Sequence, residues 1–300
     1  MHLSTHTWMR PEPLERTLQR ISGLGYRSVE LDGEPAKYHP IETTRALLHT
    51  YGTSCWGAVT IMHGSRDLTA ADPRQRADTV QYIKDVVAMA AALGGSVVTV
   101  VPATVGKIVP SSSPEDEWAW VVDGLREICA FAQTRNIRIG LEPLNRFETY
   151  FLNRVDQALR LADEVGFANC GITFDPFHLA IEERDMFAAL RKSGPRIVDF
   201  HVSDNNRLAA GDGSFDWKRI VDTLREVGYK GALAVECMPP IDRTPASPYI
   251  AQGGQLETGP ITDVPAETLQ FLRAHGSWVL SDKYYTSLME RSAETILPLL

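Results

Sequence analysis

The most informative segment of the chain reads Leu141-Glu142-Pro143-Leu144-Asn145-Arg146-Phe147-Glu148. It continues an apolar run, Ile137–Leu141, that is typical of a buried β-strand. Pro143 has no backbone N–H to donate and therefore ends the strand. Glu142 is thus expected at the carboxyl end of a strand, where a carboxylate faces the mouth of a β/α fold and not its core.

Three later segments repeat this pattern of an apolar strand that ends in one side chain able to bind a metal. They are Gly171-Ile172-Thr173-Phe174-Asp175, Ile197-Val198-Asp199-Phe200-His201 and Ala232-Leu233-Ala234-Val235-Glu236. Because the carboxyl ends of parallel strands meet at one rim, these ends are expected to converge. Three carboxylates and one imidazole suit Mn²⁺, Co²⁺ or Mg²⁺ better than a structural zinc ion. The predicted ligands of one divalent ion are Glu142, Asp175, His201 and Glu236.

Each of these residues also has a simpler explanation when it is considered alone. A carboxylate after a strand is often the N-cap of the next helix or a solvated charge, which would account for Glu142 or Asp175. His201 would be explained as a core histidine with satisfied ring nitrogens. The metal-site hypothesis therefore depends on all four residues occurring on strands five to eight of one fold.

The order of strand-like and helix-like runs predicts a closed (β/α)₈ TIM barrel. The expected strands are Leu3–Thr7, Ser28–Leu31, Ser54–Ile61, Ser96–Val101, Ile137–Leu141, Gly171–Phe174, Ile197–Phe200 and Ala232–Val235. The expected helices between them are Pro13–Leu24, Ile41–Tyr51, Pro73–Leu93, Pro114–Arg135, Arg154–Val165, Met186–Lys192 and Trp217–Val227. Such alternation favours parallel pairing with right-handed crossovers. An open doubly wound sheet is the alternative, but no GxGxxG follows the first strand.

The chain is expected to form a single domain over residues 1–300, with two interruptions of the βα rhythm. A polar loop, Met62–Asp72, follows the third strand and carries His63. Residues 239–264 are rich in Pro and Gly and predict an extended rim loop over the mouth, as a lid or a partner surface. Beyond this loop, Pro265–His275 and Tyr284–Leu299 are expected to be helices that close the barrel wall.

Composition and charge limit the class of partner. The 300 residues are 44% hydrophobic and carry a formal net charge of −8. An acidic balance argues against nucleic acid, because a phosphate backbone is bound by a basic face. No apolar run is long enough to span a membrane, and the N-terminus has no apolar signal core. A cytoplasmic protein with a small-molecule ligand is expected.

Together these motifs resemble the xylose-isomerase-like barrels of sugar isomerases and epimerases, and among them most of all the ketose 3-epimerases that act on tagatose and psicose. The resemblance is carried by the stretch 141–148, by Phe174-Asp175-Pro176-Phe177-His178, by Phe200-His201-Val202-Ser203-Asp204 with Arg207, and by Val235-Glu236. The separations of the four predicted ligands, 33, 26 and 35 residues along the chain, also resemble those of the epimerases. The resemblance covers mainly residues 137–237.

The resemblance implies a mechanism and a role for each residue. In such epimerases one metal-bound glutamate removes the C3 proton of a ketose, an enediolate forms on the metal, and a second glutamate returns a proton to the opposite face. Glu142 and Glu236 would then be the catalytic pair as well as ligands, with Asp175 and His201 as ligands only. Glu148, His178 and Arg207 would bind the substrate. The resemblance also implies one Mn²⁺ ion and a homo-oligomer.

Other functions of the same barrel family stay open because the chain departs from the small epimerases after Glu236. One alternative is a lyase, either the catalytic subunit of a C-glycoside deglycosidase, which removes the aglycone from a 3-oxo-sugar and works with a small partner subunit, or a dehydratase of a keto-polyol. A non-catalytic sugar-binding barrel is a further alternative. The apurinic endonucleases of this barrel class use a basic groove, which the acidic balance disfavours.

Overall fold

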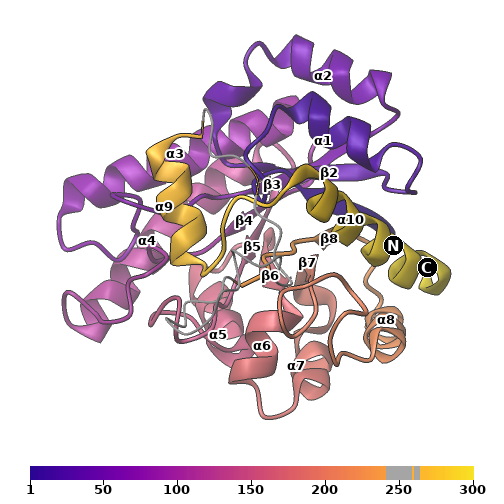
Figure 1. The fold of residues 1–300 in the computed structure, drawn as a ribbon. Coiled ribbons are helices and arrows are strands. Elements are labelled where there is room, and N and C mark those ends of the chain that lie inside the picture. Colours follow the sequence, from indigo (N-terminus) through magenta and orange to yellow (C-terminus); the bar gives the residue numbers. More distant parts are fainter. Residues whose placement is uncertain (241–258, 260–263) are drawn as a thin grey trace, which may run out of the picture.

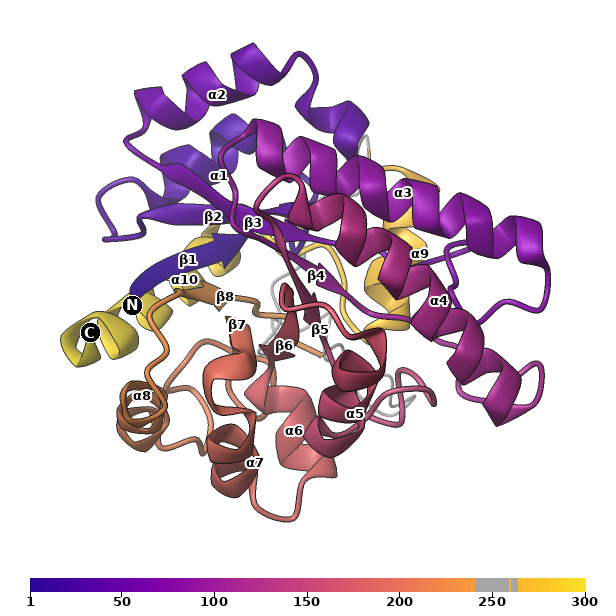
Figure 2. The same ribbon diagram turned by 180° about the vertical axis from the view of Figure 1, so that it is seen from behind.

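The computed structural model of the protein describes residues 1–240, 259 and 264–300, and its central feature is a closed parallel barrel. The eight strands pair in chain order, from β1 around to β8 and back to β1 (Figures 1 and 2). They are β1 His2–His6, β2 Ser28–Asp32, β3 Ser54–Val59, β4 Val97–Val100, β5 Arg138–Leu141, β6 Cys170–Phe174, β7 Ile197–Val202 and β8 Ala232–Val235. The predicted TIM barrel is therefore confirmed, with every strand within a few residues of its expected position.

Most of the helices surround this barrel on its outer side (Figure 1). The helices of the described residues are α1 Leu14–Ile21, α2 Ile41–Thr50, α3 Pro73–Ala92, α4 Pro114–Gln133, α5 Val155–Val165, α6 Pro176–Glu182, α7 Met186–Ser193, α8 Trp217–Glu226, α9 Ala266–Ala274 and α10 Asp282–Ile296. Short 3₁₀ helices are η1 Pro35–Tyr38, η2 Gly194–Arg196 and η3 Leu297–Leu299.

One helix, α6, was not predicted, because its seven residues are too few to show an apolar period. It begins directly after β6 with Pro176 at its first position, and the side chain of Asp175 accepts from the backbone N–H of Phe177 at 2.8 Å. A proline at the first helical position is favoured because the missing N–H would have no partner there. His178 consequently lies in α6, three residues after Asp175.

The interior of the barrel contains hydroxyl and charged side chains as well as apolar ones. Thr99 of β4 and Thr173 of β6 lie with their Oγ1 atoms 2.8 Å apart across the barrel, and both are fully buried. Gly140 of β5 lies between them in the strand order, and a Cβ at this position would overlap Thr173 Oγ1. The glycine therefore lets β5 accommodate a hydroxyl from its neighbour, two residues before Glu142.

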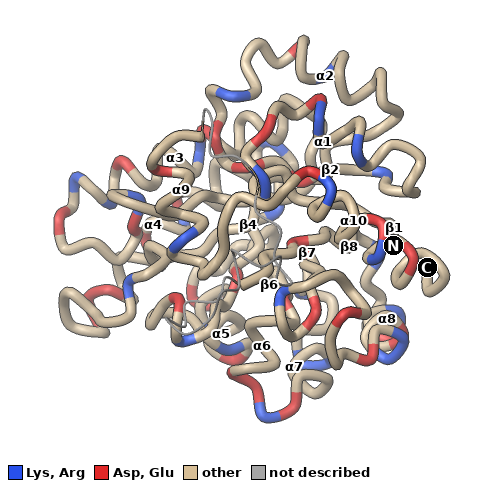
Figure 3. Tube along the Cα trace, viewed as in Figure 1, with Lys and Arg blue, Asp and Glu red and all other residues tan. Residues whose placement is uncertain are grey.

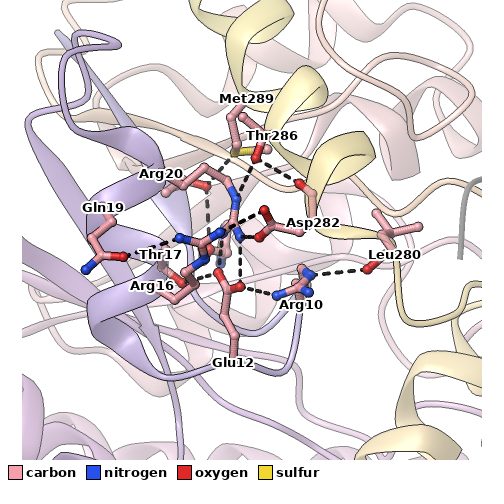
Figure 4. Close-up of polar contacts among 12 residues, drawn as sticks. Arg10, Glu12, Arg16, Thr17, Gln19, Arg20, Leu280, Asp282, Thr286 and Met289 are labelled. Carbon is pink, nitrogen blue, oxygen red and sulfur yellow. Dashed lines mark hydrogen bonds and ion pairs between the residues drawn. The ribbon is translucent and has the colours of Figure 1, made fainter. Parts of the chain in front are cut away.

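The barrel wall beside β1 is completed by α10, which an ion-pair network joins to α1 (Figure 4). Glu12 is at its centre and pairs with Arg20 and Arg10. Arg20 reaches across to α10, where Nη2 lies 2.6 Å from Asp282 Oδ1 and Nε donates to Thr286 Oγ1 at 3.0 Å. The side chains of Glu12 and Arg20 are only 3% and 2% exposed, so water screens this pair little.

The other C-terminal helix, α9, does not take the position that the sequence suggested. It lies over the carboxyl-terminal mouth of the barrel, where Phe271 contacts Trp8 with ring centroids 5.1 Å apart and His63 at 5.9 Å. The prediction that both terminal helices close the wall is thus right for α10 and wrong for α9. Most of the predicted rim loop 239–264 falls outside the described residues.

Acidic and basic residues are both distributed over the outer helices (Figure 3). In this view the described residues present acidic and basic positions side by side, without a continuous basic stripe. Within the described part of the chain, no helix is both long and apolar enough to cross a bilayer.

The Glu12 network predicts a large effect on stability. In Glu12→Gln the carboxylate is lost while Arg20 stays buried, so the free energy of unfolding should fall by about 3 kcal/mol. The matched control is Arg16→Ala, because the pair between Arg16 and Asp282 is half exposed and should contribute less than about 1 kcal/mol. Urea denaturation of both variants measures the difference, and equal losses would contradict a dominant role for the buried pair.

Candidate metal centre and active site

Four side chains from the last four strands converge at the carboxyl end of the barrel. Glu142, Asp175 and Glu236 each directly follow a strand, whereas His201 lies within β7. The backbone N–H groups of Glu142 and Glu236 donate to Val100 O at 3.1 Å and to Val202 O at 2.8 Å, so both residues still belong to the hydrogen-bond ladder. The hydrogen bonds between the strands therefore fix the backbone positions from which these two carboxylate side chains extend.

The ligand atoms of these four residues form one compact group. One atom from each of Glu142, Asp175, His201 and Glu236 lies within 4.8 Å of the others, and all four residues are buried. His201 is central, with Nδ1 2.9 Å from Glu142 Oε1 and 3.3 Å from Glu236 Oε2. The predicted ligands are thus brought together by the fold.

The unsatisfied atoms of this group fit a divalent cation. Asp175 Oδ1 caps α6, but Asp175 Oδ2 is buried without a hydrogen-bond partner, as is His201 Nδ1. Burial, followed by the negative charge of Glu236, raises the pKa of Asp175 to about 8. Burial also raises the pKa of Glu142. Three carboxylates held together away from water repel one another, and a bound cation would remove this cost.

Asp175 therefore caps a helix with one oxygen, while its other oxygen is free to bind a ligand, so the two explanations that the sequence offered for this residue are compatible. The four residues can hold one ion with three oxygens and one nitrogen, a donor set that Mn²⁺, Co²⁺ and Mg²⁺ accept. No sulfur ligand is part of the group, which separates it from a structural zinc site.

A second polar cluster adjoins this group and contains the three predicted substrate-binding residues. Arg207 Nη2 lies 2.8 Å from His178 Nε2 and 3.3 Å from Glu148 Oε1. His178 Nε2 is 3.4 Å from Asp175 Oδ2, which connects the cluster to the metal ligands. Asn145 Nδ2 donates to Glu148 Oε1 at 2.9 Å. All three predicted residues are therefore at the mouth.

The charges within this second cluster are set by burial and by mutual contacts. Burial lowers the pKa of His178 to about 3, so the imidazole is neutral at ordinary pH. Burial acts to raise the pKa of Glu148, but Arg207 and His178 outweigh it and lower that pKa to about 2. The cluster thus combines an ionised carboxylate, a guanidinium and a neutral imidazole. Such a combination offers both donors and acceptors to sugar hydroxyls.

Arg207 is held in an unusual backbone conformation by a residue that the sequence did not identify as important. Its φ of 59° lies in the left-handed region, which a non-glycine residue rarely adopts. Asp204 O accepts from Arg207 N at 2.9 Å, and the Asp204 carboxylate accepts from Gly211 N, Phe215 N and Trp217 Nε1 at 2.9 to 3.1 Å. Asp204 therefore fixes the loop that presents Arg207.

Beneath the metal ligands is a third group of buried polar side chains that the sequence reasoning missed. His201 Nε2 lies 3.6 Å from Asp199 Oδ2 and 3.8 Å from Glu30 Oε2, and His6 packs on the His201 ring at a centroid distance of 4.4 Å. His6, Glu30 and His201 also offer ligand atoms within 4.8 Å of one another. Acidic groups facing Nε2 favour a proton there, which leaves the Nδ1 lone pair free toward Glu142 and Glu236.

A signal for these residues was present in the sequence. Asp199 precedes His201 by two, and residues two apart in a strand point to the same side. Glu30 is likewise a charged residue inside the apolar strand Ser28–Asp32, where both of its carboxylate oxygens are buried without a hydrogen-bond partner. A buried carboxylate in mid-strand indicates a partner inside the barrel.

The sequence matches the family model described as "Xylose isomerase-like TIM barrel" over residues 18–273. The chain belongs to this family. It is 28% identical over 253 residues to a D-psicose 3-epimerase of Enterocloster bolteae, covering 81% of this chain and 79% of that protein. It is 27% identical over 235 residues to a 3-dehydro-D-guloside 4-epimerase of Escherichia coli K12, covering 75% of this chain and 87% of that protein.

Solved structures share the same fold at lower sequence identity. A D-allulose 3-epimerase from Methylomonas sp. superposes with a TM-score of 0.81 at 20% identity, covering 100% of this chain and 97% of that one. A structure of an L-ribulose 3-epimerase also gives a TM-score of 0.81, at 23% identity, with 100% and 94% covered. These similarities support the barrel architecture over its full described length.

A divalent cation is expected to stabilise the protein in a pH-dependent manner. Between the ordinary Asp175 pKa of 3.8 and its folded value of about 8, the folded metal-free protein keeps a proton that the unfolded chain loses. This group therefore lowers the free energy of unfolding of the metal-free protein as pH rises through that range. A cation must displace the proton, so the gain in melting temperature on adding Mn²⁺ should increase from pH 6 to about pH 8.

Calorimetry of EDTA-treated protein with and without added Mn²⁺ measures this gain. Asp175→Asn is the comparison variant, because it keeps an oxygen that can cap α6 but loses the titrating carboxylate. The pH dependence of the gain should be reduced in this variant. A melting temperature that does not respond to any divalent ion would contradict the metal site.

Glu30 is expected to act on the metal ligands through His201. Glu30→Gln replaces the buried carboxyl group that lies 3.8 Å from His201 Nε2, so the ring should be oriented less firmly and the affinity for Mn²⁺ should fall by about tenfold, the range typical of residues that orient a ligand. Isothermal titration with Mn²⁺ measures the change. Glu42→Gln serves as the control, because Glu42 is exposed on α2 and should leave the affinity unchanged.

Proposed function

We propose that the protein is a divalent-metal-dependent sugar epimerase, which removes and returns the proton on a carbon next to the sugar's carbonyl group. The observation that carries the proposal is the convergence of Glu142 and Glu236 on His201 Nδ1, at 2.9 and 3.3 Å, within one group of four ligands. The relatives named above are ketose 3-epimerases and a glycoside 4-epimerase, which favours epimerisation over the elimination that a lyase would carry out.

In this proposal Glu142, Asp175, His201 and Glu236 hold the ion. A bound divalent cation polarises the carbonyl group and so acidifies the adjacent C–H. One of the two glutamates accepts that proton while the electron pair of the C–H bond moves into the carbonyl, which gives an enediolate. The other glutamate donates a proton to the opposite face of the same carbon. The reaction is reversible, so each glutamate serves as base in one direction and as acid in the other.

Glu148, His178 and Arg207 bind the substrate in this proposal. The guanidinium of Arg207 donates to sugar oxygens, and it is held in place by Glu148 at 3.3 Å and by the face of Phe177, whose ring centroid is 4.2 Å from Arg207 Cζ. The neutral imidazole of His178 lies between Arg207 and Asp175, so it is suited to a hydrogen bond with an oxygen near the ion. The positive charge of Arg207 also offsets the negative charge that develops in the enediolate.

Several features of this proposal are carried over from the sequence as predictions. They are Mn²⁺ as the preferred ion, a homo-oligomer or a small partner subunit, a cytoplasmic location and a single domain over residues 1–300. The mixed oxygen and nitrogen ligand set supports Mn²⁺, although Co²⁺ and Mg²⁺ share most of its preferences.

Proton exchange in D₂O tests the proposed reaction. The Mn²⁺-loaded protein should introduce deuterium next to the carbonyl of a ketose or a 3-oxo-glycoside, together with the epimer, as followed by NMR. Glu142→Gln and Glu236→Gln should each lower kcat for epimerisation by about 10³-fold, because each lacks one of the two proton carriers. Glu42→Gln is the control and should retain the wild-type rate.

Glu142→Gln and Glu236→Gln also distinguish an enzyme from a protein that only binds sugar. A sugar-binding barrel without turnover would show no exchange in the wild-type protein on any of these compounds, and both variants would bind ligand as the wild type does. Release of the aglycone without an epimer would instead indicate a lyase.

A further inference from the structure

A cavity of about 250 Å³ lies beside the candidate active site, between α9 and the segments that follow β1, β2 and β3. Its wall includes Trp8, Ile61 and Phe271, and the same three side chains also line the smaller cavity that contains Glu142, His178, Arg207 and Glu236. The two cavities therefore adjoin each other across a shared wall. The smaller one holds about 30 Å³, about the volume share of one water molecule, so most of the open space at this mouth is in the larger one.

The shared wall is aromatic. Trp8 and Phe271 meet edge to face with ring centroids 5.1 Å apart, and His63 lies 5.9 Å from Phe271 on the side of the larger cavity. A sugar ring has apolar C–H faces and hydroxyl groups around its edge, so it suits a wall of aromatic rings bordered by polar groups. The large cavity has both kinds of surface.

Four of the five acidic and basic side chains that line the large cavity are paired with one another. Arg66 Nη1 lies 2.6 Å from Glu34 Oε1, and Lys37 pairs with Asp32. The fifth, Glu267, is acidic, so the charge that these pairs leave over is negative and would repel a phosphate or a carboxylate. This favours a ligand without negative charge, such as a sugar.

One buried donor in the shared wall lacks an acceptor. Trp8 is only 7% exposed, and its Nε1 has no hydrogen-bond partner among the described residues. Leaving such a donor unpaired destabilises the protein, because the N–H has lost its hydrogen bond to water. A ligand oxygen at the junction of the two cavities would supply the missing acceptor.

We propose that the large cavity is a second subsite, which binds a second, neutral sugar ring attached to the keto sugar that reacts at Glu142 and Glu236. The substrate is then a keto-sugar glycoside and not a free ketose. This inference rests on the proposed function and narrows it, because the reacting ring occupies the metal side of the shared wall and the attached ring occupies the other side. The indole N–H of Trp8 donates to an oxygen between the two rings.

Two compounds that differ only in the second ring test the subsite. Methyl 3-oxo-glucoside carries one ring and 3-oxo-maltose carries two, and both have the same carbonyl group. Deuterium exchange by the Mn²⁺-loaded full chain should proceed with a kcat/KM at least about tenfold higher for the two-ring compound, because only this compound uses the binding energy of the second subsite.

A pair of variants on α9 tests whether the preference for the two-ring compound arises in the larger cavity. Thr268 lines only the larger cavity and is half-buried, whereas Gln270 is exposed on the same helix and lines neither cavity. Thr268→Trp fills the second subsite, so the preference for 3-oxo-maltose should fall to less than about twofold while kcat/KM for the one-ring compound is unchanged. Gln270→Trp should keep the wild-type values for both compounds. Circular dichroism establishes that each variant is folded.

His63→Ala provides a second variant should Thr268→Trp not fold, and it should likewise lower kcat/KM for the two-ring compound alone. Equal kcat/KM values for the two compounds in the wild-type protein would overturn the second subsite while leaving the epimerase proposal intact. Equal losses for both compounds in Thr268→Trp would also overturn it. Absence of exchange with either compound, and with free ketoses, would instead contradict the proposed function itself.

Discussion

The mutual repulsion of Glu142, Asp175 and Glu236 is the constraint around which the mouth of the barrel is built. Three carboxylates are buried within reach of one imidazole, and the strands that carry them leave little freedom to move apart. A divalent cation bound among these carboxylates would offset their repulsion directly. The same arrangement explains why Asp175 keeps one oxygen unpaired although its other oxygen caps a helix.

The polar groups around the four candidate ligands form two sets, one toward the mouth of the barrel and one toward its interior. His178, Arg207 and Glu148 adjoin the ligands on the mouth side, whereas Glu30 and Asp199 lie on the opposite side of His201. Groups on the mouth side can meet a sugar, and those beneath it orient the imidazole. Both sides act on the same small set of atoms, so changes at either would alter chemistry at the ion.

The sequence could predict the barrel because its strands are short apolar runs that alternate regularly with helix-like segments. It could also predict which four candidate ligands and three further polar residues meet at the mouth, since strand ends of a parallel barrel share one rim. It could not predict α6, which is too short to show periodicity, nor the role of Asp204, whose carboxylate accepts hydrogen bonds from residues up to 13 positions away. Glu30 was missed because a single acidic residue in mid-strand indicates a partner inside the barrel but does not show which residue that partner is.

The position of α9 shows a different limit. Its helical character was readable from the sequence, but the surface on which a helix packs depends on contacts with distant residues, here Trp8 and His63. Helix propensity and amphipathic pattern carry no information on such a choice among docking surfaces. The second cavity exists only because of that docking, so it could not have been anticipated.

The contacts between α1 and α10 have a consequence for how the chain folds during its synthesis. Tyr26 Oη donates to Met289 O at 2.9 Å, and Arg20 requires Asp282 and Glu12 together for its charge to be buried. During synthesis the first strand and helix leave the ribosome long before α10 does, so the apolar face around Tyr26 has no cover in the interval. Chaperone capture of nascent chains is therefore most relevant to this protein before residues 282–296 emerge.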